Sequence, residues 1–157
     1  MTYNQVSKYV SMMRDLCIKK TNGIMAPHKA IMLLSIIELI ENGKIKSNVI
    51  PIDYIISDIF RINWMKYVAN NESFAIYTCN PWTPFWHLKN EPFWHFMPIK
   101  DCICVDNIVP PGQTASVGKM KANIKYAYLD PMLFSLLCNS ENRIKLSAVL
   151  FDTYLRQ

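Results

Sequence analysis

The sequence Pro-Phe-Trp-His occurs twice, at residues 84–87 and 92–95. The two copies bring His87 and His95, two of the three histidines of the chain, into one short segment with two of its four tryptophans. Imidazole groups can bind a metal ion, transfer a proton or contact a phosphate, and exposed aromatic rings can stack on nucleic-acid bases. The repeat is therefore the first place to look for chemistry.

Four residues of the types that bind zinc occur in this region: His87, His95, Cys102 and Cys104. Their spacing argues against a zinc site, because structural sites usually take pairs of ligands from tight Cys-x2–4-Cys turns. A hydrolase is equally hard to support, since the sequence has no glycine-framed nucleophile, no His-Glu-x-x-His pair and no phosphate-binding glycine loop. We expect no metal ion, no cofactor and no catalytic residue in this chain.

A second candidate site is Ala26-Pro27-His28-Lys29, where Pro27 is placed to begin a helix. The free backbone N–H groups of a helix start attract anions, so His28 and Lys29 could hold a phosphate of nucleic acid there. Equally, His28 could cap the helix or pack against the neighbouring loop. The residues themselves leave both roles open.

Aromatic residues surround the repeat and can serve either to stack on a ligand or to fill the core. They are Trp82, Phe85, Trp86, Phe93, Trp94 and Phe96. We expect about two-thirds of them to be structural. Trp82 and Thr83 are the best candidates for exposure, because Pro81 and Pro84 stiffen this segment and keep it out of a strand ladder, which suits a preformed concave surface.

Composition and cysteine usage bound the class of protein. A chain of 157 residues with 51% hydrophobic residues suits one domain, and its net charge of +5 is compatible with a polyanionic partner without requiring one. Five cysteines without disulfide-like spacing, and no signal peptide, favour a reducing, cytoplasmic setting. The longest apolar stretch, residues 30–40, is far shorter than the ~20 residues of a membrane span, so we expect a soluble protein.

Hydrophobic periodicity predicts the elements that must position these residues. Helical spacing covers residues 3–19, 27–40 and 52–68, and two further helices are expected to open at residues 130 and 140. The second helix is apolar on all sides and should be nearly surrounded by other elements. Strand patterns cover residues 44–50, 73–79, 102–105 and 124–129.

The two copies of the repeat are expected to be the strands of a β-hairpin, with residues 89–91 as its turn. Phe85 and His87 would then face one way, and Trp86 and Leu88 the other. The fold class that follows is α+β, an antiparallel sheet with an aromatic β-hairpin packed against about five helices. Downstream, the turn-rich residues 110–118 predict a mobile loop that leads into the basic residues Lys119, Lys121 and Lys125.

Three segments occur in an order that resembles a known family. They are Ala26-Pro27-His28-Lys29-Ala30, the segment Thr83 to His95, and Leu129-Asp130-Pro131-Met132-Leu133-Phe134 followed by Asn142-Arg143 and Asp152-Thr153-Tyr154-Leu155. Taken together over residues 5–155, they resemble the DNA-binding domain that precedes the HNH nuclease domain in many bacterial restriction endonucleases. That family includes the sulfur-binding domains that recognise phosphorothioate-modified DNA.

The resemblance implies a single module, residues 1–157, that docks on duplex DNA in bacterial defence, with the nuclease domain outside this chain. The chain would then be an excised N-terminal domain or a stand-alone binder. In the sulfur-binding members, the sulfur lies in a small apolar pocket whose walls include a Tyr-Pro pair. Here Thr83-Pro84 would be that pair without its aromatic member, and His87 stands where a small residue is often found.

We therefore expect duplex DNA, modified or unmodified, as the partner, and leave the oligomeric state open. The expected contacts are His28, Lys29, Trp82, Thr83, Pro84, His87, Lys89, Lys119, Lys121 and Lys125. The cationic groups would bind phosphates, and Trp82, Thr83 and Pro84 would shape the pocket. Two alternatives are a protein-interaction module that buries the aromatic hairpin against a partner, and a metal-dependent enzyme that uses His87 and His95.

Overall fold

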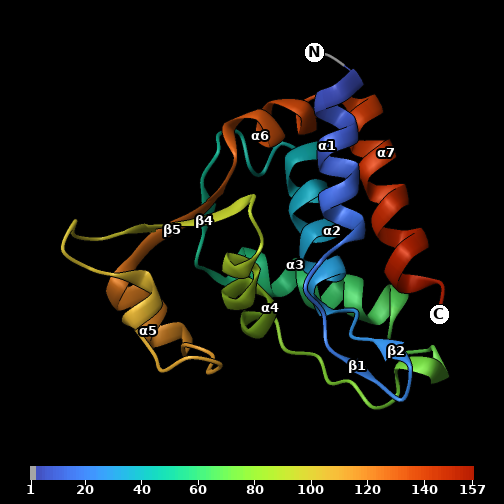
Figure 1. Cartoon of the computed structure of the whole chain (residues 1–157), viewed down its shortest axis with the longest axis horizontal. Coiled ribbons are helices and arrows are strands. Elements are labelled where there is room, and N and C mark those ends of the chain that lie inside the picture. Colours follow the sequence, from blue (N-terminus) through green and yellow to red (C-terminus); the bar gives the residue numbers. More distant parts are fainter. Residues whose placement is uncertain (1–2) are drawn as a thin grey trace.

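The computed structural model, which describes residues 3–157, combines α-helices with two small antiparallel sheets (Figure 1). The α-helices of this described range are α1 (Tyr3–Arg14), α2 (His28–Glu41), α3 (Tyr54–Tyr67), α4 (Trp82–His87), α5 (Val117–Asn123), α6 (Pro131–Leu137) and α7 (Ser140–Leu150). The strands are β1 (Lys20–Thr21), β2 (Ile24–Met25), β3 (Ile50–Pro51), β4 (Trp94–Pro98) and β5 (Ile124–Leu129). The predicted α+β class is confirmed. Within residues 3–157, no helix has the length and hydrophobicity needed to cross a membrane.

α2 is the central helix of the fold. Nine of its 14 residues are buried, and it packs against α3, α4 and α7 (Figure 1). A helix with apolar side chains all round is stable only where other elements cover it. The prediction of a buried second helix is thus confirmed, and the helix places His28 and Lys29 in its first turn.

Side chains that bind free backbone groups begin two of the other helices. The Asp53 carboxylate accepts the N–H of Ile55 at 2.9 Å at the start of α3, and the Asn139 side chain accepts the N–H of Glu141 at 2.9 Å at the start of α7. Such caps replace the hydrogen bonds that the first turn of a helix lacks. α3 and α7 accordingly begin within two residues of their predicted positions, and α6 begins at Pro131 without a side-chain cap.

The first helix is shorter than predicted, because it ends at Arg14 instead of residue 19. Its continuation is replaced by a long-range contact: the hydroxyl of Tyr154 accepts the N–H of Leu16 at 3.0 Å. The chain then forms the β1–β2 hairpin, whose turn residues Asn22 and Gly23 both have positive φ, 53° and 79°. Asn-Gly is the preferred pair for such two-residue hairpin turns.

β5 is the middle strand of the three-stranded sheet, which has the antiparallel order β3-β5-β4. The strand predicted at residues 124–129 is confirmed in full. The prediction for residues 44–50 is wrong except at Ile50, where β3 begins. Residues 73–79 and 102–105 are not strands. The first segment begins within the 3-10 turn Glu72–Phe74, and the second leads into the 3-10 turn Val105–Asn107. Both segments have apolar residues that suit a strand, but in the described sheets no neighbouring strand pairs with them.

The predicted aromatic β-hairpin is wrong. The first Pro-Phe-Trp-His copy lies in helix α4, a 3-10 turn over Leu88–Asn90 follows, and only the second copy enters a strand, β4. β4 pairs with β5, so that Trp94, His95 and Phe96 lie opposite Leu129, Tyr128 and Ala127. The second copy therefore takes its strand partner from residues 124–129 and not from the first copy.

Flanking residues explain why one sequence takes two conformations. The Asn80 side chain accepts the N–H groups of Trp82 and Thr83, at 3.2 and 3.3 Å, and so begins α4. Pro84 then occupies the third position of the helix, where a backbone N–H has no helical acceptor. Before the second copy, Glu91 is extended with φ −88° and ψ 145°, as the residue before a proline prefers.

Candidate functional site

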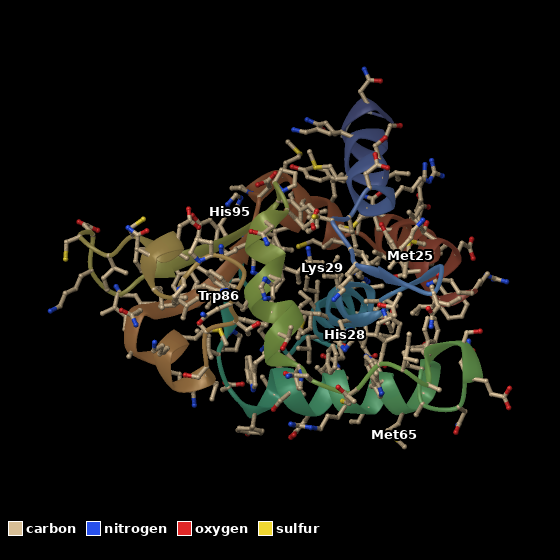
Figure 2. The ribbon with its side chains drawn as sticks, turned by 60° about the horizontal axis from the view of Figure 1, so that its bottom comes forward. Met25, His28, Lys29, Met65, Trp86 and His95 are labelled. Carbon is tan, nitrogen blue, oxygen red and sulfur yellow. The ribbon has the colours of Figure 1, made fainter. Side chains whose placement is uncertain are left out.

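A cavity of about 350 Å³ lies between the start of α2, the segment that joins α1 to β1, and α4. Its lining residues are Cys17, Ile18, Lys19, Ala26, His28, Lys29, Thr83, Pro84, His87 and Asn90. Figure 2 shows His28 and Lys29 in the space between α4 and the β1–β2 hairpin. We refer to this cavity as the recognition pocket. It brings together two of the three segments that carried the resemblance.

α4 presents three residues to the recognition pocket. Thr83 and Pro84 stand one helical turn before His87, so the three side chains share one face of the helix. Pro84 is buried, whereas Thr83 and His87 are half-buried. The opposite wall is formed by Ile18 and Ala26, which makes this part of the pocket apolar.

His28 is held on the pocket wall by polar and aromatic contacts. Its Nε2 atom lies 2.7 Å from the carbonyl oxygen of Thr78, to which it donates. The ring packs against Trp64 and Tyr77, with centroid distances of 4.7 and 5.8 Å. Burial lowers the pKa of His28, and the bond to Thr78 opposes this only in part. His28 is therefore neutral at neutral pH and both packs against and bonds to the loop before α4.

Lys29 is buried and ion-paired. Its Nζ atom lies 2.6 Å from Glu91 Oε2 and donates to the Cys17 carbonyl at 2.8 Å. The same Glu91 oxygen accepts the Cys17 N–H at 3.0 Å, so the ion pair binds both the N–H and the carbonyl of Cys17. Two of the three N–H groups of the ammonium are used within the protein. The predicted free cation on a helix start is thus a buried residue that positions one wall of the recognition pocket.

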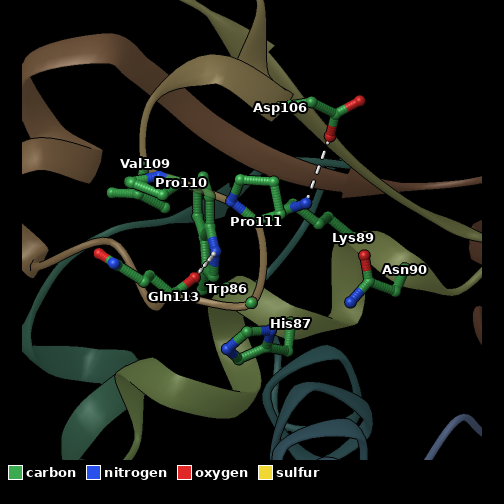
Figure 3. A pocket seen from close by; sticks show the side chains of 10 residues that line it. Trp86, His87, Lys89, Asn90, Asp106, Val109, Pro110, Pro111 and Gln113 are labelled. Carbon is green, nitrogen blue, oxygen red and sulfur yellow. Dashed lines mark hydrogen bonds and ion pairs between the residues drawn. The ribbon is translucent and has the colours of Figure 1, made fainter.

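His87 and Asn90 line both the recognition pocket and a second cavity of about 280 Å³, which Figure 3 shows. The second cavity is lined by Trp86, His87, Lys89, Asn90, Asp106, Val109, Pro110, Pro111, Gly112 and Gln113. His87 Nε2 lies 2.8 Å from the hydroxyl of Thr114, and Trp86 donates its indole N–H to the carbonyl of Gln113 at 3.1 Å. The segment 110–114, predicted to be part of a mobile loop, is therefore bound to α4.

The charges around His87 act on its protonation. Burial, followed by the positive charges of Lys29 and Lys89, lowers the pKa of His87. Lys89 lies 5.2 Å from the ring centroid of Trp86 and forms an ion pair with Asp106 at 3.2 Å. Because the Asp106 side chain is exposed, that ion pair contributes little to stability. His87 is neutral at neutral pH and carries one ring nitrogen beyond the one bonded to Thr114.

His95, the matching histidine of the second copy, lies in a different environment. Its Nε2 atom is 2.6 Å from Asp130 Oδ1, and Tyr9 donates its hydroxyl to the other Asp130 oxygen at 2.9 Å. Burial, then the hydrogen bond and charge of Asp130, raises the pKa of Tyr9 to about 12. His95 thus ties β4 to α1 and to the start of α6. It does not line the recognition pocket.

The remaining predicted contacts are divided between two regions. Trp82 is half-buried against Phe85, with a centroid distance of 5.2 Å, and lies beside the pocket without lining it. Lys119, Lys121 and Lys125 are exposed on α5 and β5; the predicted loop is irregular over residues 110–116, and its last two residues begin α5. Both views place α5 on the opposite side of α4 from the β1–β2 hairpin. The structure does not bring these lysines to the recognition pocket.

Sequence reasoning missed Ile18, Lys19, Asn90 and Glu91 as parts of the site. The sequence predicts a hairpin turn at Asn90 and Glu91 and the end of a helix at Lys19. The one signal available was the rare buried position of Lys29 within an apolar helix, since a buried lysine needs an acidic partner. That signal does not identify Glu91 among 12 acidic residues.

The histidines and cysteines that were weighed as metal ligands do not converge. His87 is bonded to Thr114 and His95 to Asp130, whereas Cys102 and Cys104 line a separate cavity beside Lys119. Across residues 3–157, no three His, Cys, Asp or Glu side chains are grouped so that they could hold a metal ion.

Comparison with protein-family models and with curated proteins finds no match to this chain.

Proposed function

We propose that the chain is a DNA-binding module and that the recognition pocket receives a group of the DNA backbone. The observation that carries the proposal is the meeting of Ala26-His28-Lys29 with Thr83-Pro84-His87 around one cavity of about 350 Å³. These segments lie far apart in the sequence, and they are the ones through which the chain resembles the DNA-binding domains of HNH-type restriction endonucleases.

The chemistry of the pocket suits a partly desolvated backbone group. Ile18, Ala26 and Pro84 supply apolar walls, on which a polarizable or poorly hydrated group is favoured over a strongly hydrated one. Lys19 is exposed at the pocket and adds a positive charge for the neighbouring phosphates. Lys119, Lys121 and Lys125 form a separate basic surface on α5 and β5, and their contribution is non-specific attraction.

The alternative of a protein-interaction module lacks the surface on which it depended. Phe85, Trp86, Phe93 and Trp94 are each at most 1% exposed. A partner protein would need exposed aromatic anchors. Of the aromatic residues around the repeat, Trp82 is the one that is half-buried and not fully buried.

A cysteine footprint tests the proposal directly. Cys17 lines the recognition pocket, Cys102 and Cys104 lie beside Lys119, and Cys138 follows α6; all four are exposed. We expect duplex DNA at about ten times its Kd to slow alkylation of Cys17 about tenfold, since only the free protein reacts. Cys138 is the internal control and should react at an unchanged rate.

The footprint also decides between the two basic regions. Protection of Cys102 and Cys104 without protection of Cys17 would assign DNA binding to α5 and overturn the role of the pocket. Protection of none of these cysteines, with no shift of plain, methylated or phosphorothioate duplex in a gel at low salt, would overturn DNA binding itself. The logarithm of the association constant should fall linearly with the logarithm of the salt concentration, with a slope of about 0.9 for each phosphate contacted.

A further inference from the structure

We propose that His87 determines the specificity of the recognition pocket: its imidazole selects an oxyanion, a phosphate oxygen of DNA, and takes up a proton when that oxygen binds. This inference rests on the proposed function. It assigns to His87 a role that the apolar walls cannot supply, namely a hydrogen bond inside the pocket from a group that can gain a positive charge.

The position of His87 is the first argument. It lies on the face of α4 that carries Thr83 and Pro84, and it lines the recognition pocket and the second cavity at once. Of the other polar groups in the recognition pocket, His28 has its Nε2 atom bound to the carbonyl of Thr78, and two N–H groups of Lys29 are bound to Glu91 and Cys17. Asn90 also lines both cavities, but of these two residues only His87 can take up a proton.

Its hydrogen bonding is the second argument. Nε2 is bonded to the Thr114 hydroxyl at 2.8 Å, which leaves Nδ1 as the ring nitrogen for a ligand. A threonine hydroxyl can donate or accept. When Thr114 donates to Nε2, the neutral ring carries its hydrogen on Nδ1 and can donate it to an oxygen. A protonated ring donates from both nitrogens, and its charge strengthens the bond to an oxyanion.

The surrounding charges are the third argument. Lys29 faces His87 from α2 and Lys89 from the turn after α4, and each is paired, with Glu91 and Asp106 respectively. Lys19 and His28 line the same pocket. In the free protein, burial and the positive charges of Lys29 and Lys89 keep the ring neutral by lowering the pKa of His87. A bound oxyanion favours the charged ring, so binding and proton uptake are linked.

The sign of the effect follows from this linkage. Binding raises the pKa of His87 from its lowered value in the free protein. Affinity for DNA therefore increases as the pH falls from the pKa of His87 in the complex to its pKa in the free protein. The gain is at most about tenfold per pH unit for one proton. Above the bound value, affinity is independent of the pH.

The experiment measures Kd for one plain duplex between pH 6 and pH 8 by fluorescence anisotropy at fixed salt. We expect wild type to bind more tightly at pH 6, and His87→Gln, which keeps a hydrogen-bonding side chain but cannot take up a proton, to lose that dependence. His95→Gln is the matched control, because His95 is bonded to Asp130 outside the pocket, and it should keep the dependence. Thermal unfolding verifies that each variant is folded.

Two further measurements make the assignment specific. His28→Gln should keep most of the pH dependence; if it removes the dependence that His87→Gln leaves in place, the inference is wrong and His28 is the group that titrates. His87→Ala should shift the ratio of affinities towards a phosphorothioate duplex of the same sequence, since an apolar wall favours sulfur over oxygen. An unchanged ratio would contradict the inference while leaving DNA binding intact. Failure of wild type to bind any duplex would instead refute the proposed function.

Discussion

The two Pro-Phe-Trp-His copies bury the same two aromatic residues on different backbones, although Pro84 is buried and Pro92 is exposed. Phe85 and Phe93 are both fully buried, and Trp86 and Trp94 are each 1% exposed, although one pair lies in α4 and the other at the start of β4. Residue type thus determines what enters the core, whereas the flanking residues and the available partner determine the conformation.

The same comparison separates the two histidines. His87 lines two cavities and is bonded to a threonine hydroxyl, whereas His95 is bonded to the carboxylate of Asp130. His87 lies on the face of α4 that lines the recognition pocket, whereas His95 on β4 is bonded to Asp130, so identical tetrapeptides place one histidine at a cavity and one in a structural contact. A repeat in the sequence is not evidence of a repeated function.

The largest effect is expected from truncating the two phenylalanines. Phe85→Ala and Phe93→Ala should each lower the free energy of unfolding by about 3–5 kcal/mol, because both rings are fully buried. Urea unfolding followed by tryptophan fluorescence measures both values. A loss below about 1 kcal/mol at one site would show that the two copies are not equally part of the core.

The tryptophans should differ by a smaller amount. Trp86 donates its indole N–H to the carbonyl of Gln113 at 3.1 Å, whereas the buried N–H of Trp94 has no hydrogen-bond partner among the described residues. Trp86→Phe should therefore destabilise the protein by about 1–2 kcal/mol more than Trp94→Phe, which removes an unsatisfied donor. Thermal or urea unfolding of the two variants decides; the reverse order would contradict the assigned hydrogen bonds.

The smallest effect concerns the start of α4. Asn80→Ala removes the side chain that accepts the N–H groups of Trp82 and Thr83, and should cost about 1 kcal/mol. Asn80→Asp retains an acceptor and serves as the control. An alanine variant as stable as wild type would mean that packing alone, without the cap, makes the first copy helical.

Elements with long, consistent patterns could be predicted from the sequence. Residues 27–40, 52–68 and 124–129 have spacings that only one type of element satisfies, and the structure agrees with them. Residues 84–95 could not be assigned in this way, because alternating bulky residues also fit one face of a short helix. The second copy forms a strand because it pairs with Tyr128 and its neighbours in β5, and the local sequence does not reveal that pairing.

The candidate site was predictable in part for the same reason. The order of segments pointed to His28, Thr83, Pro84 and His87, and these residues do meet around one cavity. The role of Lys29 could not be foreseen, because its partner Glu91 is 62 residues away. Long-range pairing of charges leaves no periodic signal in a sequence.

The hydrogen bonds that Lys29 and Glu91 make to the backbone of Cys17 determine when one wall of the recognition pocket can form. The groups that hold the Cys17 backbone come from residues 12 and 74 positions further along the chain. A growing polypeptide must therefore extend past Glu91 and collapse before that wall of the cavity is set. On the proposed function, the protein can bind its ligand only once this wall has formed, so ligand binding would report that this part of the domain is folded.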